Sequence, residues 1–220
     1  MRVGVLGGTF NPVHNAHLRL AEELRERCEL DRTLLVPAGD PPLKRSGVAP
    51  ARHRLEMLRR AVASNSALEV DDLELRRTGP SYTVDTLAEL GARWPGAELW
   101  FAIGADTLGA LESWHQPERL FGLANFAVAT RPGHAGELRE LLPPRLAAAF
   151  RERRPGSFGG RVLEHESGHK MALLPLTPLE ISARDIRERC ARGASIRYLV
   201  PDEVREYIEK HHLYRESEVD

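Results

Sequence analysis

The chain has 220 residues, and its 31 lysine and arginine residues nearly balance its 32 aspartate and glutamate residues, giving a formal net charge of −1. This balance argues against a protein that binds nucleic acid through a globally basic surface. No apolar run approaches the roughly 20 residues of a membrane-spanning helix, and the N-terminus has no signal-peptide pattern. Its two cysteines lie outside any CxxC motif, which is typical of a reducing compartment. We therefore expect a cytoplasmic protein with neither nucleic acid nor a membrane as partner.

Short apolar runs that predict strands alternate with amphipathic runs that predict helices. Strands are expected at 2–6, 33–36, 68–70, 99–103 and 126–129, with a sixth at 171–176. Helices are expected from Asn15 over about 13 to 15 residues, and then at 55–62, 84–90, 183–192 and 201–211. This alternation predicts an α/β fold, a doubly wound parallel sheet with helices on both faces.

Residues 136–160 interrupt this alternation. The stretch has a helical pattern up to about Phe150 and is then rich in Arg, Pro and Gly, so we expect a helix followed by irregular chain. The length of the chain favours one large domain. We assign residues 1–180 to its α/β core and residues 181–220 to a helical C-terminal appendage of the same domain. The oligomeric state is left open, and a homo-oligomer is compatible with the sequence.

Two glycines and two histidines lie between the first predicted strand and the helix after it. Glycines there let backbone amides approach an anion, and a helix N-terminus adds about half a positive charge. His14 and His17 would share one face of the first helical turn and donate hydrogen bonds to phosphate. Taken alone, the glycines equally predict a tight turn, and the HxxH spacing a surface pair or a metal site. Their position in one strand-to-helix loop favours phosphate binding.

The segment GGTFNPVHNAH, residues 7–17, resembles the (T/H)xxH signature loop of the nucleotidyltransferase α/β-phosphodiesterase superfamily, with Ala16 where Gly is more usual. The resemblance implies a Rossmann-like nucleotidylyltransferase fold. It also implies an enzyme that joins a nucleoside triphosphate to a phosphorylated partner and releases pyrophosphate. It assigns catalysis to His14 and His17, and contacts with ATP to Gly7, Gly8, Thr9 and Phe10.

A second segment, ISARDIR at residues 181–187, resembles the ISSTxIR signature of the same superfamily. By itself it predicts a helix start, with Ser182 as N-cap and an acidic residue three positions later, close to a capping box. A helix N-terminus with a hydroxyl and an arginine nearby is also an anion site. The resemblance assigns ATP binding to Ile181 and Ser182 and a catalytic contact with the triphosphate to Arg187. The two positions after Ser182 depart from the signature.

Two further loops carry polar residues at the expected ligand-binding edge of the sheet. Lys44, one of only three lysines among the 31 basic residues, resembles the lysine of a PPHK-type segment. We place it with the catalytic residues as a point charge for phosphate, although a solvated loop lysine is an equal alternative. Gly104 and Asp106 occupy the GxD position of the superfamily after the fourth strand, which assigns both to ATP binding and Asp106 to the ribose hydroxyls. An N-cap is the alternative for Asp106.

The segment GPSYTVDTL, residues 79–87, and Trp114 resemble features of bacterial nicotinate-nucleotide adenylyltransferases. Trp114 can stack on a pyridine ring, and Thr83 with the amides of a helix start can bind the pyridine carboxylate. By themselves these residues equally indicate an N-capped helix and a core tryptophan. The resemblance assigns nicotinate-nucleotide binding to Ser81, Tyr82, Thr83 and Trp114.

Together these resemblances imply transfer of AMP from ATP to nicotinate mononucleotide, giving deamido-NAD and pyrophosphate in NAD biosynthesis. Mg²⁺ is expected to arrive with ATP, since the sequence shows no carboxylate set for a metal site of its own. Three alternatives stay open: an adenylyltransferase for nicotinamide mononucleotide or phosphopantetheine, a non-catalytic nucleotide-binding regulator, and an HxxH metal-dependent hydrolase. The SYT segment and Trp114 discriminate against phosphopantetheine.

Overall fold

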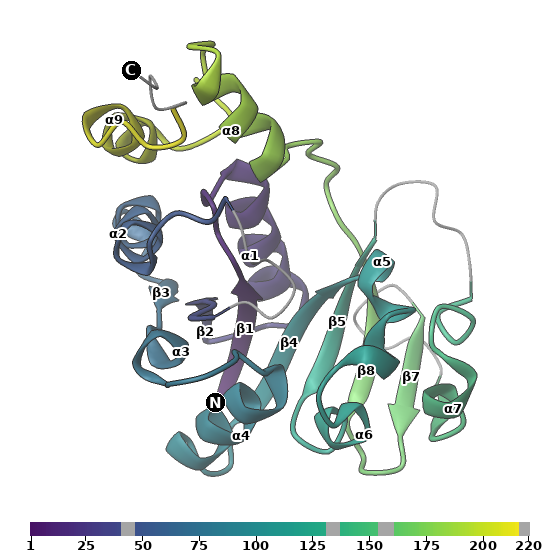
Figure 1. Cartoon of the computed structure of the whole chain (residues 1–220). Helices are drawn as coiled ribbons and strands as arrows, with labels where there is room; N and C mark the ends of the chain where they lie inside the picture. The colour runs from purple at the N-terminus through teal and green to yellow at the C-terminus, as the bar shows by residue number, and fades with distance from the viewer. Residues whose placement is uncertain (41–46, 131–136, 154–160, 216–220) are drawn as a thin grey trace.

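The computed structural model describes residues 1–40, 47–130, 137–153 and 161–215. Within these ranges it contains one eight-stranded sheet, in the order β3-β2-β1-β4-β5-β8-β7-β6 (Figure 1). The strands are β1 (Arg2–Gly8), β2 (Arg32–Pro37), β3 (Leu68–Val70), β4 (Glu98–Gly104), β5 (Asn125–Thr130), β6 (Phe150–Arg153), β7 (Val162–His165) and β8 (Lys170–Pro175). The strands from β3 to β8 in this order pair in parallel, whereas β7 and β6 continue the sheet in antiparallel pairing.

Helices cover both faces of the sheet, as the sequence predicted. They are α1 (Asn15–Arg27), α2 (Ala51–Val62), α3 (Leu73–Arg76), α4 (Thr83–Arg93), α5 (Ala105–Leu108), α6 (Pro117–Leu120), α7 (Pro144–Ala147), α8 (Ala183–Ala191) and α9 (Asp202–Lys210), with a 3-10 turn at Leu111–Ser113. None of these helices in the described ranges is long and apolar enough to cross a membrane.

Successive strand residues pack into two separate cores, one on each face. Val5 and Phe101 belong to the core shared with α3 to α7, whereas Leu6 and Trp100 belong to the core shared with α1, α2, α8 and α9. Side chains alternate between the two faces of a strand, so both sets must be apolar when both faces are covered. This explains why the strands appear in the sequence as continuous apolar runs.

β1 lies in the middle of the parallel strands, between β2 and β4, because the chain order reverses after β3. The loops that follow β1 and β4 therefore leave the sheet on either side of a topological switch point. Ligands of open α/β sheets bind in the crevice at this place. The two loops therefore face each other across this crevice.

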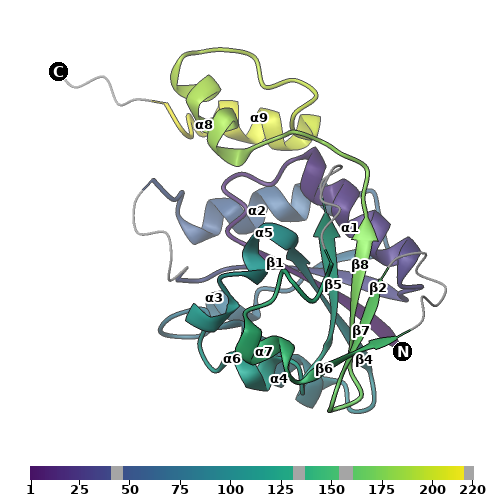
Figure 2. The same ribbon diagram turned by 90° about the vertical axis from the view of Figure 1, so that its right-hand side faces the viewer.

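The C-terminal helices α8 and α9 lie over α1 and α2 (Figure 2). α9 packs on α2, where His53 Nδ1 is hydrogen-bonded to the Tyr207 hydroxyl at 2.9 Å. The Arg60 guanidinium lies over the ring of Tyr207, 5.0 Å from its centroid. Val204 and Ile208 of α9 are buried in the same core. These contacts attach the C-terminal helices to the sheet domain.

The expectation of a helix across the first part of 136–160 is wrong. Leu138, Leu142 and Leu146 recur every four residues and are buried, which imitates one face of a helix. Two successive prolines at 143 and 144 lie in the middle of this pattern. Proline removes a backbone donor and clashes with the preceding turn, so the helix α7 begins only there and is four residues long.

The rest of that stretch was expected to be irregular, and the sheet to be parallel throughout. Instead β6 and β7 pair with each other and extend the sheet beyond β8. The segment 154–161 that joins them is shorter than the roughly dozen residues of a parallel crossover, so only antiparallel pairing is open to the two strands.

Candidate active site

Three adjoining cavities follow the edge of the sheet where β1 and β4 end. The His14 cavity, about 350 Å³, is lined by the start of α1, the end of β4 and residues 176–181. A central cavity of about 450 Å³ lies between the loop after β1, the end of β4 and α8. The Tyr82 cavity, about 300 Å³, lies between β1, α3, the start of α4 and residues 113–115. Because each neighbouring pair shares lining residues, the three form one groove.

Two imidazoles stack at the N-terminus of α1. The ring centroids of His14 and His17 are 3.7 Å apart, and His14 is the N-cap rather than a residue of the first turn. His17 Nδ1 accepts a hydrogen bond from the backbone amide of His14 at 3.3 Å, which leaves the ring proton of neutral His17 on Nε2. The structure thus brings the two predicted histidines together, with His17 at the junction of the His14 cavity and the central cavity.

His14 is nearly withdrawn from water, with 5% of its surface exposed. Burial lowers the pKa of its imidazole to about 4. Its Nδ1 has no hydrogen-bond partner among the described residues. His14 is therefore neutral at neutral pH, and it can offer a ligand one N–H donor rather than the two of an imidazolium.

The loop after β1 keeps its shape through hydrogen bonds from distant segments. Arg54 of α2 is buried and donates from Nη1 to the carbonyl of Thr9 at 2.9 Å and from Nε to the carbonyl of Ala49 at 3.0 Å. The side-chain oxygen of Asn11 accepts hydrogen bonds from the amide of Ala49 at 3.0 Å and from the Tyr214 hydroxyl at 2.9 Å. Helix α2 and the C-terminal segment therefore fix this loop from two sides.

Glycine at the end of β1 leaves room for a neighbouring aromatic ring. A Cβ at Gly8 would lie 3.2 Å from the ring of Phe10, which itself takes a positive φ of 47°. Gly7, Gly8 and Thr9 line both the central cavity and the Tyr82 cavity, and Phe10 lines the central one. The predicted contact of this backbone with a ligand is thus compatible with its position.

Asp106 lies in the first turn after β4 and lines the His14 cavity together with Gly104. A Cβ at Gly104 would lie 2.4 Å from Asp106 Oδ1, so glycine leaves room for this carboxylate. The alternative of Asp106 as an N-cap is wrong, because the N-cap position of α5 is Gly104. The structure places the Asp106 carboxylate in the same cavity as both histidines.

Ser182 is the N-cap of α8, as its sequence context predicted. Its Oγ accepts hydrogen bonds from the amides of the second and third helical residues at 3.2 and 3.4 Å. Ser182 is not among the residues that line the three cavities, although its neighbour Ile181 lines the His14 cavity. Its predicted contact with ATP has no support in this arrangement and stays a prediction.

Arg187 extends from α8 to the wall of the groove. Its Nη1 donates to the carbonyl of Asn11 at 2.8 Å and to that of Ala183 at 3.1 Å, and its side chain lines the central cavity. A guanidinium is therefore held beside the loop after β1 by that loop's own backbone. Lys44, the other cation predicted here, lies outside the described residues.

The residues predicted to bind the nicotinate nucleotide are brought together in one cavity. Its lining includes Ser81, Tyr82, Thr83 and Trp114. The ring of Tyr82 stacks on His115 at 4.2 Å, and Trp114 meets Phe101 edge to face at 6.4 Å. The amides of Thr83 and its successor, in the first turn of α4, donate to no backbone carbonyl among the described residues. The cavity thus combines aromatic walls with a helix N-terminus.

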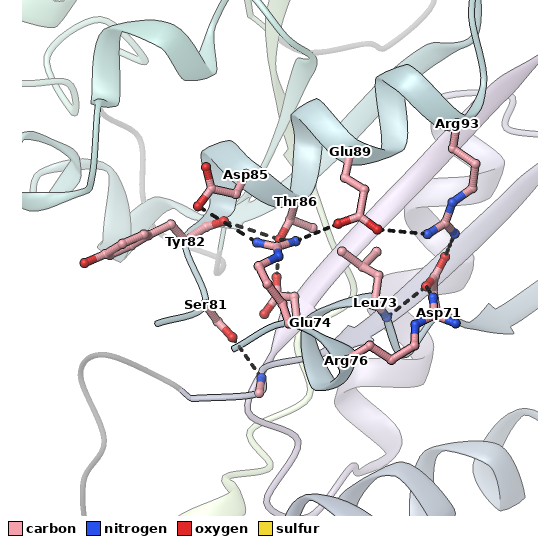
Figure 3. A network of polar contacts seen from close by, with 12 residues as sticks. Asp71, Leu73, Glu74, Arg76, Ser81, Tyr82, Asp85, Thr86, Glu89 and Arg93 are labelled. Atoms are coloured by element: carbon pink, nitrogen blue, oxygen red, sulfur yellow. Dashed lines mark hydrogen bonds and ion pairs between the residues drawn. The ribbon is translucent and has the colours of Figure 1, made fainter. Parts of the chain in front are cut away.

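Glu74 lines the same cavity from α3, and sequence reasoning missed it (Figure 3). Its carboxylate accepts a hydrogen bond from the Thr86 hydroxyl at 2.5 Å. Burial raises the pKa of Glu74, although hydrogen bonds from Thr86 and Ser81 work against this rise. The Oγ of Ser81 also accepts the amide of Gly39 at 2.9 Å. Ser81 therefore joins the wall of the cavity to the loop after β2, and its contact with a ligand stays a prediction.

Arg54 and Glu74 differ in the signal that could have revealed them. Arg54 is three and four residues before Met57 and Leu58, which are fully buried, so the helical period places it on the inward face of α2. The burial of Arg54 was not predicted because it is charged, and buried arginines are rare. Glu74 belongs to a four-residue helix in a charged stretch, where no period exists to separate a buried face from a solvated one.

Comparison with known proteins identifies the family of the chain. Residues 5–189 match the cytidylyltransferase-like family. The chain belongs to this family. A relative from Syntrophotalea carbinolica, named probable nicotinate-nucleotide adenylyltransferase, is 46% identical over 220 residues, which are 99% of this chain and 99% of its own. A relative of the same name from Geobacter sulfurreducens is 44% identical over 97% of this chain and 98% of its own. The resemblance to this group of cytidylyltransferase-like proteins is thereby confirmed.

Among solved structures, the chain is similar to Plasmodium falciparum nicotinic acid mononucleotide adenylyltransferase complexed with NaAD. The TM-score is 0.73 over 97% of each chain, at 18% sequence identity. Likeness at this identity concerns the fold. The cytidylyltransferase-like chain therefore has the Rossmann-like nucleotidyltransferase fold that its sequence predicted.

Proposed function

We propose that this protein is a nicotinate-nucleotide adenylyltransferase, which transfers AMP from ATP to nicotinate mononucleotide and produces deamido-NAD and pyrophosphate in NAD biosynthesis. The observation that carries the proposal is the row of three cavities. The first has largely apolar walls with two histidines and the Asp106 carboxylate, the second is glycine-rich with an arginine, and the third is aromatic. That order matches a nucleoside, a set of phosphates and a pyridine ring. The names of the full-length relatives support the same reaction.

The His14 cavity is the place we propose for the nucleoside of ATP. Asp106 would accept hydrogen bonds from the ribose hydroxyls, since its carboxylate lines this cavity. Ile181 and residues 176–179 would cover the base with largely apolar side chains. His17 lies where this cavity opens into the central one, and His14 stacks on it, so the two would meet the first phosphates.

The central cavity is where we propose that bonds form and break. A phosphate oxygen of nicotinate mononucleotide attacks the α-phosphorus of ATP in line, and the bond from this phosphorus to the β-phosphate bridging oxygen breaks, releasing pyrophosphate. No nucleophilic side chain takes part. The amides of Gly7 to Phe10 align the two phosphates, while His17 and Arg187 neutralise the charge that moves onto pyrophosphate. Catalysis then rests on positioning and electrostatics.

The Tyr82 cavity is the place we propose for the pyridine ring. Its lining within the described residues includes no lysine or arginine, and Glu74 is acidic. The negative carboxylate of the substrate would therefore be bound by the amides at the start of α4, where the helix dipole is positive, and by Thr83. Trp114 would stack on the ring.

ATP-using nucleotidyltransferases of this kind work with a divalent cation, and we infer that it is Mg²⁺. Among the described residues, no group of three or more His, Cys, Asp or Glu side chains is placed to hold a metal ion. We propose that the cation is carried by the triphosphate as part of the substrate.

Two broader predictions remain part of the proposal. We place the reaction in the cytoplasm, which the free thiols Cys28 and Cys190 support because such thiols are typical of a reducing compartment. We also keep residues 181–220 in one domain with residues 1–180. The supporting observation is that Arg187, from the C-terminal part, lines a cavity built by the N-terminal part.

The test is pyrophosphate release from ATP and Mg²⁺, with nicotinate mononucleotide, nicotinamide mononucleotide and phosphopantetheine compared side by side. We expect the fastest release with the nicotinate nucleotide. Absence of release with it would contradict the proposed function. Equal rates with nicotinate and nicotinamide nucleotides would contradict only the preference for the carboxylate. A Trp114→Ala variant should raise KM for the pyridine nucleotide. KM for ATP should stay within about twofold, because Trp114 lines the Tyr82 cavity and the central cavity but not the His14 cavity proposed for the nucleoside of ATP.

A further inference from the structure

The outer wall of the His14 cavity is a single stretch of irregular chain. Residues 176–181 join β8 to α8 without secondary structure, passing from the sheet to the C-terminal helices (Figure 2). Five of these residues line the cavity: Leu176, Thr177, Pro178, Leu179 and Ile181. We call residues 176–181 the connecting segment. Since its side chains face the space proposed for the nucleoside, its position sets the width of that space.

The connecting segment is tied to the body of the fold by one buried carboxylate. The backbone amide of Thr177 donates to both oxygens of Glu23 in α1, at 3.2 Å to Oε1 and 2.9 Å to Oε2. The amide of Ile181 donates to Leu179 within the segment itself. In the part of the chain that the structure describes, no other backbone amide of the segment donates to the rest of the protein. Glu23 is thus its hydrogen-bonded anchor.

Glu23 is built to stay ionised although it is buried. Its side chain is 3% exposed, and Arg19 donates to Oε1 at 2.7 Å, with Arg27 at 4.0 Å from Oε2. Burial works to raise the pKa of Glu23, but hydrogen bonds from Thr177 and Arg19 outweigh it and leave that pKa below its ordinary value. A charged acceptor makes the bond to the Thr177 amide stronger than a neutral one would.

We propose that Glu23 is a positioning residue for the nucleotide side of the reaction: by holding the Thr177 amide, it fixes the connecting segment against α1 and keeps the His14 cavity shaped for the nucleoside of ATP. Glu23 also lines this cavity, but we assign its effect to the position of the segment and give its side chain no part in the chemistry. This inference rests on the proposed function only for the identity of the nucleotide. It predicts weaker binding of ATP, with little change in the binding of the second substrate.

The test compares three variants of the full chain. Glu23→Ala removes the acceptor, Glu23→Gln keeps one uncharged oxygen for the Thr177 amide, and Glu26→Gln is the matched control. Glu26 lies on the same helix and is paired with Arg19 at 3.1 Å, but it is exposed and outside the cavity. Two quantities are measured: the Kd of ATP by calorimetry without the second substrate, and hydrogen exchange in a peptide that contains Thr177. Thermal unfolding of each variant shows whether it is folded.

We expect Glu23→Ala to raise the Kd of ATP about tenfold, which is the scale of one charge-assisted hydrogen bond. Exchange at the Thr177 amide should become faster in the same variant. Glu23→Gln should recover most of the affinity, and Glu26→Gln should match the wild type in both measurements. Among folded variants, wild-type affinity or unchanged exchange in Glu23→Ala would overturn the proposal. Equal losses in Glu23→Ala and Glu26→Gln would also overturn it, because the helix charge would then be responsible.

These readouts are separate from those of the proposed function. Binding of ATP and exchange at Thr177 are measured without turnover, so an enzyme that used another acceptor phosphate would still show the Glu23 effects. Conversely, a chain that failed to bind ATP in its wild-type form would contradict the proposed function first. If Glu23→Ala is unfolded, the nearly isosteric Glu23→Gln is compared with Glu26→Gln instead. Hydrogen exchange at the Thr177 amide must then be faster in Glu23→Gln than in Glu26→Gln.

Discussion

Helices α1 and α8 both begin at the groove, yet their first turns are arranged differently. At α8, the Ser182 hydroxyl accepts hydrogen bonds from two amides of its own helix. Among the described residues of α8 that lie beyond its first turn, only Arg187 lines the central cavity. At α1, two stacked imidazoles take the N-cap and third positions, and one of them lies between two cavities.

This difference separates two ways of binding a phosphate at a helix N-terminus. An N-cap that satisfies its own amides stabilises the helix, but its oxygen and those amides are then committed to one another. In the proposed function, the anion at α8 would therefore be bound by a cation, Arg187. At α1 both imidazoles line the His14 cavity, and the proposed catalysis depends on them. The four predictions below test this distinction.

The largest expected effect is that of His17→Ala. Losing a donor that meets charge developed in the transition state costs roughly 2–4 kcal/mol. We therefore expect kcat for pyrophosphate release to fall by about two to three orders of magnitude, while the variant stays folded by circular dichroism. The control is Arg25→Ala on the same helix, away from the three cavities. An unchanged kcat in His17→Ala would contradict a catalytic role for the start of α1.

The second effect concerns stability against acid. In the folded protein the pKa of His14 is about 4, against 6.5 for the free side chain, so the unfolded chain takes up this proton first as pH falls. Stability from this group is present above pH 6.5 and is lost toward pH 4, by about 3 kcal/mol in total, since one pKa unit is worth about 1.4 kcal/mol. Urea unfolding between pH 4 and 7 should show this loss in the wild type and not in His14→Gln. Parallel curves would argue against a buried neutral His14.

The third effect is that of Arg187→Lys. Arg187 donates to both carbonyls from Nη1 alone, which leaves its other guanidinium nitrogens for a ligand. Lysine keeps the charge but has a single nitrogen for all these contacts. We expect kcat/KM for ATP to fall about tenfold, which corresponds to about 1.4 kcal/mol. Arg189→Lys, on the same helix but paired with Asp185, is the control. If Arg187→Lys matched the wild type, a single positive charge would be sufficient at α8.

The smallest effect is that of Ser182→Ala. Removing an N-cap oxygen costs about 1 kcal/mol of stability, visible as a lower urea midpoint. If Ser182 only caps α8, KM for ATP should stay within about twofold of the wild-type value. A clear rise in this KM without loss of stability would instead give Ser182 the contact with ATP that the signature implies.

The fold could be predicted where the residue pattern and the tertiary environment agree. The runs that became β1, β2 and β4 are apolar on both faces because both faces are covered, and the glycines at the end of β1 mark the turn into α1. The stretch around Leu138, Leu142 and Leu146 failed because apolar spacing alone cannot separate a helix from a folded-back loop whose leucines reach the same core. There the two prolines decided the outcome.

The site residues that belong to a sequence signature could be predicted. The residues that hold the walls of the groove in place could not. His14, His17, Asp106, Trp114 and Arg187 stand in short motifs and do line the groove. Glu23, Arg54 and Glu74 are charged residues in charged stretches, where a solvated position is the ordinary expectation. Only the tertiary structure shows that each is buried because backbone or hydroxyl groups from remote segments supply its partners.

The hydrogen bond from the Tyr214 hydroxyl to Asn11 joins residues 203 positions apart in the chain. During synthesis on a ribosome, the loop after β1 emerges early, but this partner emerges among the last residues. The loop therefore cannot acquire its complete set of hydrogen bonds until the C-terminal helices have left the exit tunnel and docked. A nascent chain can therefore complete the sheet, whose last strand ends at Pro175, before this loop has all its hydrogen bonds.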